Sequence, residues 1–189
     1  MPQKTPRMPP IPEAQLSEAQ RKAVADVLAG PRKSLVGPFI PLMRSPDFMD
    51  RLQKTGAYLR YSSAFEPRLS EMAILITARL WSQNFEWYAH RPIAEEAGLK
   101  VAVIDAIAEG RRPAEMAADE AAIWDFLDEL SRIRTVSDAT YGRALKLFGE
   151  RGIIDLVGIH GYYSLLAMVL NVSQAPVPDG GAQGLQPVP

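Results

Sequence analysis

The chain has 189 residues, of which 47% are hydrophobic, and this fits one globular domain with its own core. Lys and Arg total 21 against 22 Asp and Glu. This balance excludes the one-signed charge with which proteins bind nucleic acid or an acidic membrane surface, so we expect neither partner. The chain has no cysteine, which excludes disulfides, thiolate metal ligands and dithiol redox chemistry.

Proline marks both ends of the chain. Five of the 16 prolines lie within the first twelve residues, and four follow Gln174 together with three glycines. Because such segments cannot form a core alone, we predict a proline-rich N-terminal arm over residues 1–15, one helical domain over residues 16–173 and a Pro/Gly-rich tail over residues 174–189. The N-terminal segment lacks the apolar centre of a secretory signal, and we expect a cytoplasmic protein.

Caps and turns predict the first helices. Ser17-Glu18-Ala19-Gln20 has the pattern of a capping box, which opens a predicted helix over residues 17–28 before Gly30. A turn at Gly37-Pro38-Phe39 precedes a short apolar stretch that reaches Met43. Ser45 is placed to cap a helix with a proline in its first turn, and the spacing of apolar residues extends this helix to about residue 60.

Pro67 opens the next predicted helix, over residues 67–80, in which apolar side chains occur on nearly all faces. A helix of this kind lies in the centre of a protein. The following helix, over residues 84–97, ends at Gly98. Pro92 lies inside it and removes one backbone hydrogen bond, so we predict a kink near His90.

Four more helices are predicted over residues 101–109, 117–132, 137–148 and 153–171. No stretch alternates with the period of a strand, and the predicted fold class is therefore all-α. Residues 156–172 contain no Asp, Glu, Lys or Arg, but glycines and polar side chains interrupt the apolar run. We expect a buried helix here, in the core or at a subunit interface, rather than a membrane span.

The strongest candidate site combines two glutamates with a histidine. Glu86 and His90 are four residues apart and so share one face of a helix. Glu71 precedes His90 by nineteen residues, and it reaches the imidazole if the two helices pack antiparallel. A carboxylate beside a histidine fixes its tautomer and raises its pKa, which favours proton donation near neutral pH. The alternative interpretation is an exposed pair of side chains without a function.

Other kinds of site have weaker signals. The same three side chains form a set of two carboxylates and one imidazole, but the HExxH pattern of zinc enzymes is absent, and we expect no metal. His160 lies among apolar residues and is interpreted as a core histidine. A guanidinium binds a carboxylate with two hydrogen bonds, and the candidate anchors of this type are Arg44, Arg60, Arg68 and Arg79. The sequence contains neither a glycine-rich phosphate loop nor a GxSxG pattern.

Five stretches carry a likeness to a known family. They are Gly37-Pro38-Phe39; Arg60-Tyr61; Arg68-Leu69-Ser70-Glu71 through Ala78-Arg79; Asn84-Phe85-Glu86-Trp87-Tyr88-Ala89-His90 with its continuation to Leu99; and Val157-Gly158 with Gly161-Tyr162-Tyr163-Ser164 and Asn171. Together they span about residues 36–175. They resemble the carboxymuconolactone decarboxylase family, whose wider group includes the alkylhydroperoxidase D-like proteins.

The resemblance has one informative departure. The peroxidase branch of this group has a C-x-x-C-x-x-x-H motif with an upstream glutamate. Here Gln83 and Glu86 stand at the two cysteine positions, while His90 and Glu71 keep the matching spacing. Because peroxide reduction through a disulfide needs thiols, the chain is not expected to be a Cys-dependent peroxidase, and the decarboxylase-like branch remains.

The resemblance implies a fold and an activity. The expected fold is a single-domain, alkylhydroperoxidase D-like helical bundle that assembles as a homo-oligomer, a trimer or hexamer, with its pocket near a subunit interface. The expected activity is a carboxy-lyase without cofactors, which converts γ-carboxymuconolactone to the enol-lactone of β-ketoadipate in aromatic-acid catabolism. The small-molecule partner is then a carboxylated lactone.

The reaction implied in this way assigns roles to particular residues. His90 is the proton donor, Glu71 orients it, and Glu86 is a second carboxylate near the reacting group. The substrate-binding residues are expected to be Gly37, Pro38, Phe39 and Trp87 in the pocket wall, with Arg44 or Arg68 holding the distal carboxylate.

Two other functions fit the same sequence. One is a related lyase or isomerase that acts on another lactone or dicarboxylic acid. The other is a non-catalytic helical oligomer that binds a small acid or a partner protein. A lyase requires Glu71, Glu86 and His90 to cluster in a pocket within hydrogen-bond reach, whereas the non-catalytic protein predicts them exposed and apart.

Overall fold

The computed structural model describes residues 5–178 and residue 185. Over this part of the chain it is helical and contains no strand, which confirms the all-α prediction. The elements are η1 (Glu13–Gln15), α1 (Glu18–Ala29), α2 (Phe39–Leu42), α3 (Pro46–Tyr61), α4 (Pro67–Leu80), α5 (Asn84–Glu96), α6 (Val101–Ala108), α7 (Ala118–Ile133) and α8 (Asp138–Ser173).

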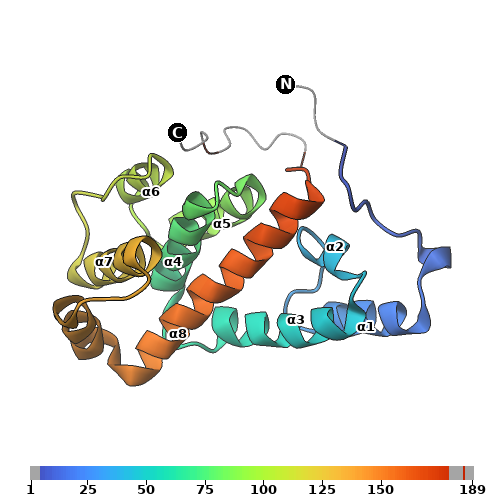
Figure 1. Cartoon of the computed structure of the whole chain (residues 1–189), viewed down its shortest axis with the longest axis horizontal. Coiled ribbons are helices and arrows are strands. Elements are labelled where there is room, and N and C mark those ends of the chain that lie inside the picture. The colour runs from blue at the N-terminus through green and yellow to red at the C-terminus, as the bar shows by residue number, and fades with distance from the viewer. Residues whose placement is uncertain (1–4, 179–184, 186–189) are drawn as a thin grey trace.

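Helix α8 runs along the molecule and joins two groups of helices (Figure 1). Helices α4, α5, α6 and α7 lie on one side of it, and α1, α2 and α3 lie on the other. Contacts of α8 with α3, α4 and α7 tie the two groups together. The candidate site is formed where α4, α5 and α8 meet the segment between α1 and α2.

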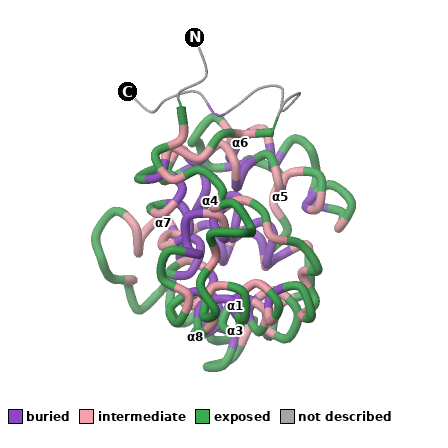
Figure 2. The backbone as a smooth tube through the Cα atoms, turned by 90° about the vertical axis from the view of Figure 1, so that its right-hand side faces the viewer, coloured by how far each residue is buried: buried purple, intermediate pink, exposed green. Residues whose placement is uncertain are grey.

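Helix α4 is the centre of the core, as its apolar side chains on nearly all faces predict. Every residue from Leu69 to Arg79 is buried, and the buried part of the backbone gathers around this helix in Figure 2. Met72 and Leu75 are fully enclosed, and burying one such side chain stabilises the fold by about 1.5–3 kcal/mol. A polar residue on this helix is therefore held rigidly by its neighbours.

The structure shows how the helices continue through two points where the sequence predicts an interruption. Helix α5 continues through Pro92 as far as Glu96. The two helices predicted over residues 137–148 and 153–171 both form, but they follow each other in α8 across a break at Gly149, where φ is 66° and ψ is 177°. These dihedral angles are not helical, so the direction of the helix changes there. Glycine adopts a positive φ of this kind without strain.

The arm and the tail are only partly described. Residues 5–12 have no regular secondary structure, and the Arg7 amide donates to the Ser173 carbonyl oxygen at 2.8 Å, so the arm lies against the end of α8. In the tail, residues 179–184 and 186–189 lie outside the described residues, while Leu185 is buried.

One helix, α8, is long and apolar enough to cross a membrane, judged on length and composition among the described residues. Half of its most apolar window is buried inside the protein. A core helix of a soluble protein can have the same length and composition.

Candidate functional site

His90 is held between two carboxylates in the interior of the protein. Its Nδ1 lies 2.5 Å from Oε2 of Glu71, and its Nε2 lies 3.4 Å from Oε2 of Glu86. The exposed fractions are 5% for His90 and 3% for each glutamate. The sequence predicts this contact between Glu71 and His90 only if the helices that carry them pack antiparallel. The structure brings all three side chains together.

The connection between α4 and α5 sets this geometry. The side chain of Gln83 caps α5 by accepting hydrogen bonds from the amides of Phe85 and Glu86, at 2.5 and 3.4 Å. It also donates to Oδ1 of Asn171 at 3.0 Å, and Asn171 donates to the Trp81 carbonyl oxygen at 3.2 Å. The start of α5 is thereby fixed to α8, so Glu86 and His90 face α4.

The two glutamates control the charge of His90. Burial alone lowers the pKa of the imidazole, but the hydrogen bond and the charge of Glu71, followed by those of Glu86, outweigh burial and raise this pKa to about 9. The imidazole is therefore protonated at neutral pH. Its Nδ1–H donates to Glu71, which leaves the Nε2–H beside Glu86 as the proton that can be transferred.

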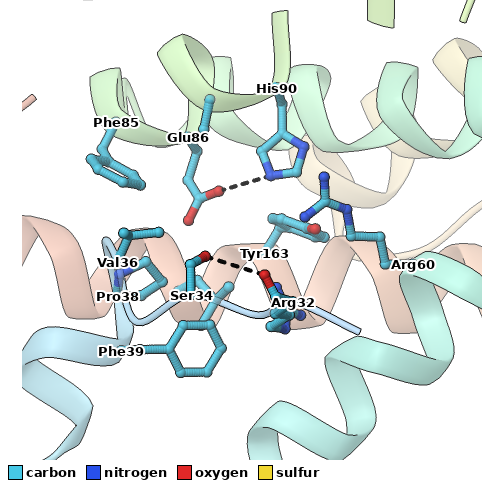
Figure 3. A pocket seen from close by; sticks show the side chains of 12 residues that line it. Arg32, Ser34, Val36, Pro38, Phe39, Arg60, Phe85, Glu86, His90 and Tyr163 are labelled. Carbon is cyan, nitrogen blue, oxygen red and sulfur yellow. Dashed lines mark hydrogen bonds and ion pairs between the residues drawn. The ribbon is translucent and has the colours of Figure 1, made fainter. Parts of the chain in front are cut away.

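A cavity of about 100 Å³ opens in front of His90 and Glu86 (Figure 3). A single water needs about 10–15 Å³ of such volume, so the cavity accepts a small organic molecule. Its lining is Arg32, Ser34, Val36, Pro38, Phe39, Arg60, Phe85, Glu86, Ala89, His90, Tyr163 and Leu166. Glu71 is absent from this lining because it lies behind the imidazole, as an orienting group does.

Tyr163 provides a neutral hydroxyl in the same cavity. Its ring contacts the imidazole of His90 edge-on, with the centroids 5.1 Å apart. Burial, together with the charges of Glu86 and Glu71, raises the pKa of Tyr163 well above its ordinary value. The hydroxyl therefore stays protonated. Among the described residues it has no hydrogen-bond partner, so it can donate to a ligand.

One oxygen of Glu86 is left without a partner. Oε1 is buried and accepts no hydrogen bond from any described residue, while Oε2 faces His90. In Figure 3 the carboxylate projects from α5 toward the segment between Ser34 and Pro38. A buried acceptor without a donor costs about 1–3 kcal/mol, and a bound molecule with a donor group removes this cost.

The predicted turn at residues 37–39 forms one wall. Pro38 and Phe39 line the cavity. Gly37 itself does not, but it has a φ of +58° and packs so closely on Phe85 that an added Cβ would lie 2.3 Å from the ring. Only glycine fits here without strain, so Gly37 brings the turn against the start of α5.

Besides Gly37, three more predicted binding residues lie outside the cavity lining. Arg44 donates to the main-chain oxygens of Ile40 and Pro9, at 3.1 and 2.6 Å, and so fastens the N-terminal arm. The prediction that Arg44 or Arg68 holds a substrate carboxylate does not match these positions, because neither guanidinium lines the cavity. Trp87 is 3% exposed and belongs to the hydrophobic core instead of the pocket wall.

Arg68 is occupied by acidic partners on the far side of α4. Its guanidinium pairs with Glu66, Asp119 and Glu120 at 2.8, 2.6 and 2.5 Å. These carboxylates already use its donor groups. The arginine therefore joins the start of α4 to the start of α7. No local pattern indicates this contact, because Asp119 lies 51 residues away.

Two arginines other than Arg44 and Arg68 line the cavity. Arg60 was one of four candidate anchors, and Arg32 was not among them. Arg32 follows Gly30-Pro31 in an irregular segment, where no periodic pattern indicates which way a side chain points. The resemblance did include Arg60 and Tyr163, and this was the one available signal for these two residues.

The second histidine is half-buried and hydrogen-bonded, away from the cavity. His160 Nδ1 lies 2.9 Å from Oγ1 of Thr77, and Nε2 lies 3.5 Å from Oγ of Ser131. Burial, followed by the charge of Arg134, lowers its pKa, so it is neutral. Within residues 5–178 and 185, no group of three acidic or imidazole side chains has an arrangement that holds a metal ion.

Comparisons with protein-family models, curated proteins and solved structures found no match. The chemistry of the site consequently rests on its geometry. A protonated imidazole, a carboxylate and a neutral phenol converge on a small cavity, and this set can donate a proton, accept a proton and stabilise a developing negative charge.

Proposed function

We propose that the protein is a carboxy-lyase that works without a cofactor and acts on a small carboxylated lactone, as the resemblance to carboxymuconolactone decarboxylases suggests. The observation that carries the proposal is the burial of His90 between Glu71 and Glu86 at the wall of a cavity. A non-catalytic binding protein has no need for an imidazole that is kept charged in its interior, where ionised groups are costly.

In the proposed reaction, the bond between the ring carbon and the departing carboxylate breaks. Its electron pair moves through the conjugated lactone onto the carbonyl oxygen, and carbon dioxide leaves. The Nε2–H of His90 then protonates the ring carbon next to that carbonyl, so the carbonyl re-forms and the remaining ring double bond is that of the enol-lactone. A proton from the solvent restores the imidazolium. A positioned acid of this kind accelerates a reaction by roughly 10²–10⁴-fold.

Three other side chains support this step. The negative charge of Glu86 repels a carboxylate placed beside it, which favours departure as neutral carbon dioxide. The free hydroxyl of Tyr163 is available to hydrogen-bond the lactone oxygen as it becomes negative, and one such donor is worth about 2.7–4 kcal/mol. Glu71 holds the imidazole in the required tautomer and orientation.

A proton-shifting isomerase is the second candidate. Glu86 and His90 place a carboxylate and an imidazolium 3.4 Å apart on one cavity wall, and such a pair can remove a proton at one carbon and return it at another. The two activities separate cleanly in an assay, because only the lyase releases carbon dioxide.

We also propose that the chain forms a homo-oligomer. Helix α8 has exposed apolar side chains at Ile154, Val157, Met168 and Val172, with exposed fractions of 69, 42, 43 and 59%. Exposed apolar patches of this kind are typical of subunit contacts. Light scattering on the purified protein measures the mass, and a monomer at micromolar concentration would refute the assembly.

The decisive experiment follows carbon dioxide release from γ-carboxymuconolactone and from a panel of related lactones and dicarboxylic acids. We expect His90→Gln to lower kcat at least 100-fold with little change in the circular dichroism spectrum. His160→Gln is the matched control, because it changes the other histidine, which is half-buried and lies away from the cavity, and it should retain activity. Equal turnover by the His90→Gln variant and the wild type would reject the assignment.

A further inference from the structure

The cavity contains two guanidinium groups whose donors are largely unused. Arg60 approaches Glu71, with Nε and Oε1 3.9 Å apart, but it makes no hydrogen bond to a described residue. Arg32 donates to the hydroxyl of Tyr162 at 3.2 Å, and its Nε is buried without a partner in the described part of the chain. Because each guanidinium has five N–H donors, the two together leave most of their hydrogen-bonding capacity to a ligand.

The charges around the cavity do not balance. Arg32, Arg60 and the protonated His90 are cationic, while Glu86 and Glu71 are the acidic groups at the cavity wall and behind it. One positive charge is left over. An anion that enters the cavity therefore meets a complementary field, and a low-dielectric wall strengthens this attraction relative to water.

The fold holds Arg32 in place. Its guanidinium lies 5.0 Å from the ring centroid of Phe39, in a cation–π contact, which is worth roughly 0.5–2 kcal/mol. It also packs on the backbone of α3 at Gly56, where an added Cβ would lie 2.4 Å from one of its terminal nitrogens and 2.1 Å from the Tyr162 hydroxyl. Tyr162 is thus a positioning residue, and Gly56 leaves room for it.

The charges in the cavity are separated, with the carboxylate on one wall and the guanidinium groups on the opposite wall and at the side. Figure 3 shows Glu86 and His90 projecting from α5, with Arg32 on the opposite wall and Arg60 at the side. A carboxylate is repelled by Glu86 and attracted by the two arginines. A ligand with one anchoring carboxylate consequently enters in a single orientation, with its other end toward His90.

We propose that Arg32 and Arg60 form a carboxylate-binding subsite that selects small organic acids and turns the reacting end of the molecule toward His90. The proposal rests on the proposed function for the identity of that reacting end. It assigns the anchoring role to this pair and removes it from Arg44 and Arg68, which are engaged elsewhere.

The test uses 2-furoate, a flat acid with a five-membered ring, and its neutral isostere 2-furamide, with binding measured by calorimetry. We expect wild-type protein to bind 2-furoate with a dissociation constant of about 1 mM and 2-furamide at least tenfold more weakly. Arg32→Gln and Arg60→Gln should each weaken 2-furoate binding at least tenfold, since each removes charge-assisted hydrogen bonds. Arg112→Gln, which changes an exposed arginine outside the cavity, is the matched control and should bind as the wild type does.

A conservative variant protects the test against misfolding. Tyr162→Phe keeps the buried ring and removes only the hydroxyl that supports Arg32. It should reduce the preference for 2-furoate over 2-furamide about threefold, which a loss of general stability would not do. The proposal is overturned if 2-furoate fails to bind, if 2-furamide binds equally well, or if neither arginine variant changes the affinity.

These outcomes are separate from those of the proposed function. Arginine-dependent binding of 2-furoate by a protein that turns over none of the lactones would support the subsite and refute the lyase. Conversely, lactone turnover that depends on His90 but is indifferent to Arg32→Gln and Arg60→Gln would support the lyase and refute the subsite.

Discussion

The pairing of His90 with Glu71 predicts how stability depends on pH. In the folded protein the pKa of His90 is raised to about 9, whereas histidine in an unfolded chain has a pKa of about 6.5. Between these values the folded protein keeps a proton that the unfolded chain has released. The stabilisation is therefore complete below pH 6.5 and is lost as the pH rises through 9.

The magnitude follows from the size of this interval. The free energy of unfolding should fall by about 1.4 kcal/mol for each pH unit between pH 6.5 and 9, or about 3 kcal/mol in total. The Glu71→Gln variant keeps a hydrogen-bond acceptor near Nδ1 but removes the negative charge. Burial and Glu86 then compete, the pKa of His90 falls, and the slope flattens.

Urea unfolding at intervals of half a pH unit measures this slope, and NMR follows the protonation of the imidazole directly. The chain has two histidines, and His160, whose pKa is lowered by burial and then by Arg134, gives no transition near pH 9. The reasoning is refuted if the wild type and the Glu71→Gln variant have the same slope between pH 6.5 and 9.

Glycine positions give further predictions about the cavity walls. Gly56→Ala inserts a Cβ 2.1 Å from the Tyr162 hydroxyl, so a loss of about 1–3 kcal/mol from overpacking should exceed the gain of up to about 1 kcal/mol in helix propensity. Gly142→Ala, where nothing lies within 4 Å of the new Cβ, is the matched control in a helix and should be neutral or stabilising in the same urea titration. Gly37→Ala forces a residue with a side chain to a φ of +58° and against Phe85. It should cost about 2 kcal/mol or more and weaken 2-furoate binding, and a variant as stable as the wild type would contradict the role given to this turn.

Local patterns in the sequence were enough for most of the helices. The capping box at Ser17 forms as predicted, with both reciprocal hydrogen bonds present. The largely apolar helix α4 is buried from Leu69 to Arg79. These predictions succeed because caps and amphipathic spacing act within a few residues of each other. The position of Glu86 relative to His90 was equally secure, because one turn of helix fixes it.

Predictions that needed long-range contacts were less successful. Arg44 and Arg68 had the chemistry of carboxylate anchors, but carbonyl groups of the arm and carboxylates of α7 engage them. Trp87 is adjacent in sequence to Glu86, yet it faces the core. Sequence position cannot decide which of several arginines meets a cavity, since the partners come from distant elements.

The amino-acid sequence alone therefore determined that the protein is helical, that it lacks thiol chemistry, and that a glutamate and a histidine share one helical face. Only the tertiary structure decided that Glu71 meets the other side of the imidazole, at 2.5 Å, and that Arg32 and Arg60 line the cavity in front of it. The physical reason is the range of the forces involved. Helix formation is settled among near neighbours, whereas the charge of a buried group and the shape of a cavity depend on the packing of the whole chain.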